Sequence, residues 1–195
     1  MHRSSFVNII GNPNVGKSSL TNSLLGHKLS IITSKAQTTR HRILAILNEE
    51  NYQLVISDTP GIIKPAHKLH ETMMDFVSLT TEDADILLYV VEYKDHTLKD
   101  EKLFSKIKKI NIPVILVINK IDLIDQNKLN DELDYWKLKL PNAEIWPISE
   151  GITYCSSITR AAPRPVPGPI KREFPLNGIP SFMNSISFRF IDAKL

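Results

Sequence analysis

Short apolar runs alternate with amphipathic stretches over the first 150 residues of the chain. Runs rich in Val and Ile predict strands, and apolar residues spaced three and four positions apart predict helices. Strands are predicted at residues 6–10, 43–47, 52–56, 85–91, 113–118 and 143–148, and helices at 18–25, 98–110 and 129–140. Because strands and helices alternate, we predict an α/β fold with a three-layer, doubly wound, mostly parallel sheet. Ligands of such sheets bind beyond the carboxyl ends of the strands.

The loop after the first predicted strand has the pattern of a phosphate-binding loop. Residues 11–18 match G-x-x-x-x-G-K-[ST] in full, between a strand and a helix as that motif requires. Its glycines let backbone N–H groups surround an anion, and the helix N-terminus adds a favourable dipole. We expect Lys17 to reach the β- and γ-phosphates of a nucleotide and Ser18 to bind Mg²⁺. The candidate nucleotide contacts here are Gly11, Asn12, Pro13, Asn14, Val15, Gly16, Lys17, Ser18 and Ser19.

A second motif follows the strand at 52–56 and consists of Asp58, Thr59, Pro60 and Gly61. An acidic residue at a strand end beside a phosphate-binding loop can hold Mg²⁺, and the backbone N–H of Gly61 can donate to a γ-phosphate. A capped turn explains the same residues equally well. This motif therefore indicates a nucleotide site only in combination with the other two motifs.

A third motif, Asn119, Lys120 and Asp122, follows the strand at 113–118. The carboxylate of Asp122 can accept hydrogen bonds from N1–H and the 2-amino group of guanine, a donor pair that adenine lacks. We expect Lys120 to pack along the base and Asn119 to join this loop to the phosphate-binding loop. The tetrapeptide alone also fits the start of a helix. Together and in this order, the three motifs predict a guanine-nucleotide-binding P-loop GTPase whose ligands are GTP or GDP and Mg²⁺.

Residues 30–43, with the sequence SIITSKAQTTRHRI, resemble the first switch segment of the Era family of bacterial GTPases. The likeness extends over about residues 5–149. It implies hydrolysis of GTP to GDP, with switch segments at 30–42 and 61–70 that order around the γ-phosphate.

The same resemblance implies a further ligand of Mg²⁺ in the first switch. This ligand is Thr39, with Thr38 as the alternative, and both could instead be polar loop residues without a role. The candidate metal ligands are therefore Ser18, Thr39 and Asp58.

Ile62 stands where many Ras-like GTPases have the Gln that orients the attacking water. A hydrocarbon side chain cannot orient water, so catalysis must rest on other groups. In some relatives the residue that matches Asn14 helps to bind K⁺, which would stabilise charge as an arginine finger does. A turn-forming role for Asn14 is the alternative. The candidate catalytic residues are Lys17, Thr39, Gly61 and Asn14, and K⁺ is a candidate cofactor.

The likeness to the Era family ends inside the last guanine-contacting loop. That loop has a Ser-Ala pair in the family, and here Ser149 is followed by Glu150. A backbone N–H at Glu150 can still reach guanine O6, so both residues remain candidate nucleotide contacts. Beyond Gly151 we find neither the family's closing helix nor the G-x-x-G loop of its RNA-binding KH domain. We therefore predict a GTPase domain over residues 1–150 that lacks its last helix.

Charge and proline content change at the same point. Residues 1–150 carry 18 Lys+Arg against 19 Asp+Glu, whereas residues 151–195 carry six against two and hold six of the twelve prolines. We predict an irregular, basic tail over 151–195. It is either a segment that binds RNA or a partner, or the product of a shifted reading frame or premature end. We favour the shifted frame because the likeness stops abruptly.

The Era resemblance also implies a place of action. It implies a role in assembly of the small ribosomal subunit, around its 16S rRNA, in the cytosol and in part at the inner membrane surface. A single Cys fits a reducing compartment. Without a KH domain we do not expect direct RNA binding, and we expect a monomer. Two alternatives stay open: a nucleotide-responsive binding module without turnover, and a truncated product that does not fold stably.

Overall fold

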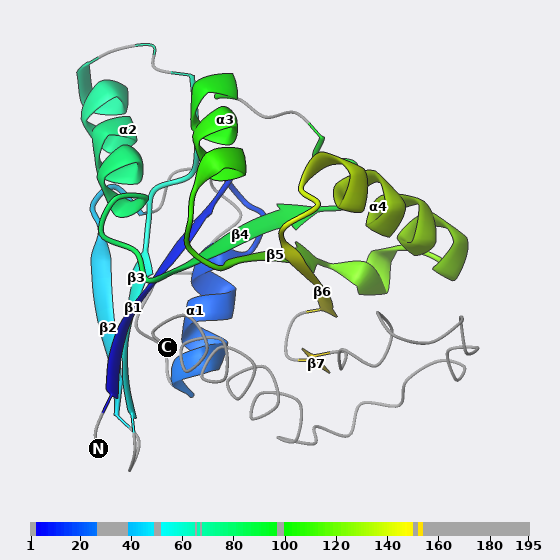
Figure 1. Cartoon of the computed structure of the whole chain (residues 1–195), viewed down its shortest axis with the longest axis horizontal. Coiled ribbons are helices and arrows are strands. Elements are labelled where there is room, and N and C mark those ends of the chain that lie inside the picture. Colours follow the sequence, from blue (N-terminus) through cyan, green and yellow to red (C-terminus); the bar gives the residue numbers. More distant parts are fainter. Residues whose placement is uncertain are drawn as a thin grey trace.

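Seven strands form one sheet in the computed structural model, which describes residues 3–26, 39–48, 52–64, 66, 68–96, 100–149 and 152–153. The strands are β1 (Arg3–Gly11), β2 (Ile43–Asn48), β3 (Tyr52–Asp58), β4 (Ile86–Glu92), β5 (Val114–Asn119), β6 (Glu144–Ser149) and β7 (Ile152–Thr153). They lie in the order β2-β3-β1-β4-β5-β6-β7 (Figure 1). β3, β1, β4, β5 and β6 are parallel, while β2 and β7 pair antiparallel with their neighbours.

The described helices are divided between the two faces of the sheet. They are α1 (Lys17–Leu25), α2 (Lys68–Thr80), α3 (Glu101–Lys109) and α4 (Gln126–Lys139), and a short 3₁₀ turn, η1 (Ile121–Leu123), follows β5. Alternate residues of β4 separate two apolar clusters, as period-two side-chain alternation requires. Leu88 and Val90 belong to the cluster with α1, and Leu87 and Tyr89 to the cluster with α2, α3 and α4. The predicted three-layer, mostly parallel α/β fold is confirmed.

Capping side chains set the starts of two helices more precisely than apolar spacing does. Asp100 accepts hydrogen bonds from the backbone N–H groups of Lys102 and Leu103, so α3 begins at Glu101 rather than at the predicted residue 98. Asp125 caps α4 in the same way, and this helix begins three residues before its predicted start at 129. Both corrections follow from the preference of helix N-termini for an aspartate cap.

α2 is a helix that the sequence analysis did not predict. Its buried residues, Met73, Val77 and Thr80, have helical spacing, so a signal is present in the sequence. Leu69 and Leu79 of the same helix are 48% and 55% exposed. Apolar residues on the outer face widen the apolar stripe and weaken the amphipathic pattern from which a helix is predicted.

The parallel strands bring five separate points of the chain to one edge of the sheet. β1, β3, β4, β5 and β6 end there at Gly11, Asp58, Glu92, Asn119 and Ser149. All three sequence motifs follow strands that end at this edge. β7 lies beyond the predicted domain boundary at residue 150, next to β6; the division into domain and tail stays a prediction. Within the described residues, no helix combines the length and apolar character needed to cross a membrane.

Candidate functional site at the carboxyl edge of the sheet

The phosphate-binding loop connects β1 to α1 in a conformation that only glycine tolerates at two points. Gly16 precedes α1 with a φ of 97°, and a Cβ there would lie 2.1 Å from Nδ2 of Asn119. A Cβ on Gly11 would lie 2.2 Å from the carbonyl oxygen of Val90. The loop therefore lies in close contact with β4 and with the end of β5, where a side chain larger than glycine does not fit.

Lys17 opens α1 and is buried, with 7% of its surface exposed. Its Nζ donates to the carbonyl oxygen of Asn12, at 2.8 Å. Burial lowers the pKa of Lys17 to about 8, although the carboxylates of Asp58 and Asp95 act in the opposite direction. A buried ammonium group at the N-terminus of a helix attracts phosphate strongly, because a bound anion would stabilise the positive charge that burial destabilises.

The three candidate metal ligands lie together. The hydroxyl of Ser18 donates to Asp58 Oδ2 at 2.8 Å, and the hydroxyl of Thr39 lies 3.4 Å from both the Ser18 hydroxyl and Asp58 Oδ2. Asp58 is fully buried, and its Oδ1 has no hydrogen-bond partner in the described part of the chain. Two hydroxyls around a buried carboxylate with an unused oxygen fit Mg²⁺, which prefers oxygen ligands. The alternative ligand, Thr38, lies outside the described residues.

The segment after Asp58 is held against the phosphate-binding loop. The backbone N–H of Ile62 donates to the Gly11 carbonyl at 3.0 Å, and the hydroxyl of Thr59 donates to the Ile9 carbonyl at 2.6 Å. A Cβ on Gly61 would lie 2.8 Å from three atoms of Pro13. Pro60 is buried beside them. Gly61 therefore stands directly beside the phosphate-binding loop, where the second motif predicts it.

Ile62 is 4% exposed and belongs to the apolar cluster beneath α2, α3 and α4. Its side chain therefore points into the core and offers the site no polar group. This agrees with the sequence-based argument that another group must orient the attacking water.

The side chains of Asn119 and Lys120 join the third motif to the phosphate-binding loop. Asn119 is 2% exposed, and its Nδ2 donates to the carbonyl oxygen of Val15 at 2.9 Å. Nζ of Lys120 donates to the carbonyl oxygen of Asn14 at 2.8 Å and forms an ion pair with Glu92. The predicted connection through Asn119 is therefore present in the structure.

Asp122 lies in η1 and is exposed, so its carboxylate is accessible to a ligand. Ser149 ends β6 at the same edge of the sheet and is partly buried. Glu150 lies outside the described residues, as do residues 30–38 of the first predicted switch. Their predicted contacts stay predictions. Ser19, in the first turn of α1, and Asn14, which is exposed with a φ of 65°, complete the predicted set.

Two acidic residues at this edge, Asp95 and Glu92, belong to no predicted motif. Asp95, in the connection from β4 to α3, accepts two hydrogen bonds from Nδ2 of Asn12, at 2.7 and 2.9 Å. Glu92 contacts Lys120 from the end of β4. No short pattern marks these acids, because Asp95 and Asn12 are 83 residues apart in the sequence. Only the topology, which places β1 beside β4, brings them together.

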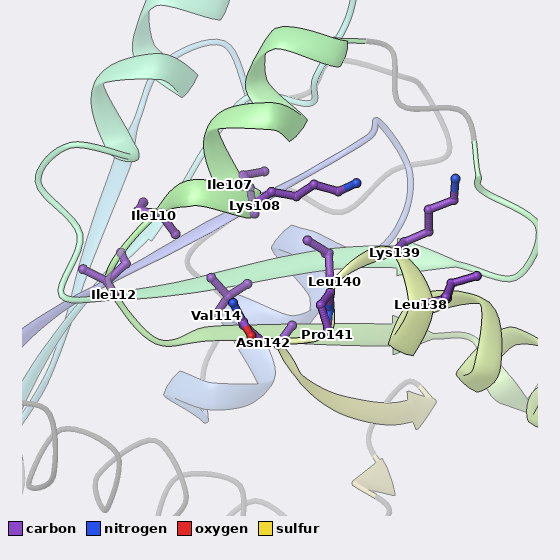
Figure 2. A pocket seen from close by; sticks show the side chains of 11 residues that line it. Ile107, Lys108, Ile110, Ile112, Val114, Leu138, Lys139, Leu140, Pro141 and Asn142 are labelled. Carbon is purple, nitrogen blue, oxygen red and sulfur yellow. The ribbon is translucent and has the colours of Figure 1, made fainter.

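A groove of about 320 Å³ lies away from this site, between α3 and α4. Figure 2 shows it between the end of α3, the start of β5 and the connection from α4 to β6. Aliphatic side chains such as Ile107, Ile112 and Leu140 line it, with Lys108 and Lys139 at its margin. It contains none of the predicted site residues.

The fold and the carboxyl-edge site define a P-loop GTPase domain. The family described as 50S ribosome-binding GTPase matches residues 6–120. The chain belongs to this family.

Its relatives include GTPase Era of Clostridium novyi (strain NT), with 45% identity over 150 residues, which are 76% of this chain and 51% of that protein. A crystal structure of Era in complex with MgGDPNP and nucleotides 1506–1542 of 16S ribosomal RNA matches 77% of this chain and 52% of its own, with 40% identity and a TM-score of 0.70. An Aquifex aeolicus Era variant bound to GDP·AlF4⁻ matches 75% and 51%, with 40% identity and a TM-score of 0.69. The resemblance to Era is thus confirmed, and the chain spans about half the length of these relatives.

Proposed function

We propose that the chain binds GTP with Mg²⁺ at the carboxyl edge of its sheet and hydrolyses it to GDP and phosphate. One observation carries this proposal: Asn119 of the guanine motif donates to Val15 of the phosphate-binding loop. The candidate base contacts and phosphate contacts thereby meet in one site. The ligands are supported by the two Era structures, which hold MgGDPNP and GDP·AlF4⁻.

Each motif has its own task in the proposed reaction. Lys17 and the backbone N–H groups of its loop neutralise charge on the β- and γ-phosphates. Asp122 selects guanine by accepting from its N1–H and 2-amino group. Ser18, Thr39 and Asp58 would hold Mg²⁺, which when bound shields phosphate charge and polarises the γ-phosphoryl group. Gly61 would donate its N–H to the γ-phosphate.

In the proposed reaction, water attacks the γ-phosphorus, the bond to the bridging oxygen breaks, and GDP and inorganic phosphate leave. Because Ile62 is buried, it cannot orient this water. We propose that K⁺ bound with the help of Asn14 supplies part of the missing charge stabilisation. Faster turnover in KCl than in NaCl at equal ionic strength is expected, and equal rates would exclude the K⁺ proposal.

The central experiment is thermal unfolding with GTP·Mg²⁺, with ATP·Mg²⁺ and without nucleotide, together with single-turnover hydrolysis. A cooperative transition whose midpoint rises with GTP and not with ATP supports guanine-nucleotide binding. Release of phosphate then supports the enzyme. Tight GTP binding without phosphate release favours the binding module, which the absence of a polar side chain at Ile62 makes worth testing. No cooperative transition would overturn the assignment for this chain.

We propose further that the chain acts in assembly of the small ribosomal subunit. Support comes from the Era structure that contains nucleotides of 16S ribosomal RNA. We propose action as a monomer, in the cytosol and in part at the inner membrane surface. Cosedimentation with isolated small subunits, with GTP or GDP present, tests the partner. A chain that stays in the supernatant under both conditions would refute it.

A further inference from the structure

Asp95 is connected to the phosphate-binding loop by a short chain of hydrogen bonds. Both of its carboxylate oxygens accept from Nδ2 of Asn12, at 2.7 and 2.9 Å. Asn12 is 5% exposed, and its carbonyl oxygen accepts from Nζ of Lys17 at 2.8 Å. The carboxylate of Asp95 therefore holds Asn12 in place, and the carbonyl oxygen of Asn12 in turn accepts a hydrogen bond from the ammonium group of Lys17.

The segment that carries Asp95 is itself held on two sides. Its backbone N–H donates to the Glu92 carbonyl at 2.9 Å and closes a turn at the end of β4. The next residue, His96, contacts both carboxylate oxygens of Glu132, at 3.0 Å. Glu132 is 2% exposed and also accepts from Nε1 of Trp136 at 2.8 Å. A turn on one side and a buried carboxylate of α4 on the other keep Asp95 in place.

The charge of Asp95 has two opposite effects on the proposed site, one of which is that it favours the charged form of Lys17. A carboxylate near the phosphate groups of a nucleotide repels them. What Asp95 adds beyond its charge is direction, because both of its carboxylate oxygens accept from Nδ2 of Asn12. Charge-assisted hydrogen bonds to a buried partner are stronger than neutral ones and impose a fixed direction.

We propose that Asp95 is a positioning residue of the phosphate site: it fixes Asn12, and through the Asn12 carbonyl it fixes the ammonium group of Lys17 for a bound nucleotide. This inference rests on the proposed GTP hydrolysis, and it adds a residue outside the three sequence motifs to the site.

The test is a double-mutant cycle on the full chain, with kcat and KM for GTP measured separately. Asp95→Ala and Asn12→Ala are each expected to lower kcat/KM on the order of tenfold, since each removes a charge-assisted hydrogen bond. The double variant is expected to lose no more than either single variant, because both changes break the same connection. Asp95→Asn should recover most of the loss, since its amide oxygen still accepts from Asn12.

Glu82→Gln is the matched control. Glu82 is likewise an acidic residue with a side-chain partner, in an ion pair with Lys106, but it lies before β4, whereas Asp95 lies after it. This variant should keep the wild-type kcat/KM. The melting temperature of each variant separates loss of folding from loss of positioning.

If the wild-type chain turns over GTP normally, any one of three results would overturn the proposal. They are an unchanged kcat/KM for Asp95→Ala, losses that multiply in the double variant, and equal losses for Asp95→Asn and Asp95→Ala. Absence of turnover in the wild-type chain would instead overturn the proposed function, and this inference with it.

Discussion

The two ends of this sheet are held by different kinds of contact. At the carboxyl end, side chains such as Asn12, Asp58 and Asn119 are at most 5% exposed and form hydrogen bonds to distant segments of the chain. At the opposite end, between α3 and α4, aliphatic side chains line an open groove. Hydrogen bonds fix direction and fail when one partner is lost, whereas apolar contacts lose strength gradually.

This difference separates activity from stability. The carboxyl end needs fixed loops, because a charged ligand must meet several donors at once. The groove end only has to cover apolar surface. Variants at the two ends should therefore differ in which property they lose, and four pairs of measurements test this.

The largest effect is expected at Lys17, the ammonium group of the phosphate site. Lys17→Met should lower kcat/KM for GTP by about a hundredfold or more, since a buried positive charge that faces phosphate has no substitute. The same variant should be more stable than the wild type at pH 7. Burial lowers the pKa of Lys17 to about 8, from an ordinary value of 10.5, and the charged form is therefore penalised in the folded state.

The sign of this effect depends on pH. Below pH 8 the lysine is charged in both states, and its burial then costs on the order of 3 kcal/mol. Between pH 8 and 10.5 the unfolded chain keeps the proton and the folded chain releases it, so wild-type stability rises with pH. The difference in melting temperature between Lys17→Met and the wild type should therefore be largest at pH 7 and shrink toward pH 9.5. A difference that stays constant over this range would contradict the pKa assignment.

The next effect is expected at Asn119, which joins the guanine motif to Val15. Asn119→Ala leaves the Val15 carbonyl without this donor and the Lys120 backbone N–H without the acceptor Oδ1. We expect a loss of about 1–3 kcal/mol in unfolding free energy and a loss of GTP affinity on the order of tenfold. Denaturant unfolding and titration with a fluorescent GTP analogue measure the two quantities.

Asn142→Ala is the control for this prediction. Asn142 is an exposed asparagine that lines the groove at the other end of the sheet. Its replacement should change neither quantity. If Asn142→Ala lowered GTP affinity as much as Asn119→Ala, the two ends of the sheet would not differ as described.

The part of the site that the sequence predicts is the part that is local in the chain. Residues 11–18 form a loop between a strand and a helix, so their arrangement follows from a short segment. Asn119 reaches Val15 over 104 residues, yet this contact was predictable because parallel strands place their carboxyl ends together. The contact of Asp95 with Asn12 needs the exact pairing of β1 with β4, and no residue pattern specifies it.

Two helix predictions missed local signals that the sequence contains. α2 was not predicted because Leu69 and Leu79 lie on its exposed side. The start of α3 was placed too early, since the apolar spacing does not show where the Asp100 cap ends the preceding loop. The aspartate read as a cap corrects the start of α3, and the helical spacing of Met73, Val77 and Thr80 is the sequence signal for α2.

At the groove end, a stability effect without an activity effect is expected. Leu140 is 4% exposed and lines the groove, so Leu140→Ala should lower the unfolding free energy by about 2–3 kcal/mol. Turnover of GTP at 25 °C should stay at the wild-type rate. Leu138→Ala is the control, because Leu138 lines the same groove but is 83% exposed and should cost little. A fall in kcat for Leu140→Ala in a still folded protein would show that the ends are coupled.

The smallest effect is expected at Lys139, in the last turn of α4. Its Nζ lies 5.6 Å from the centre of the Tyr135 ring, and its positive charge interacts favourably with the negative end of the helix dipole. At an exposed position, the two contributions together amount to less than about 1 kcal/mol. Lys139→Ala should therefore lower the melting temperature slightly at low ionic strength, and the loss should shrink in 1 M NaCl because salt screens the dipole interaction. A large, salt-independent loss would mean that the lysine stem covers apolar surface, and the groove end would then depend on one side chain as the carboxyl end does.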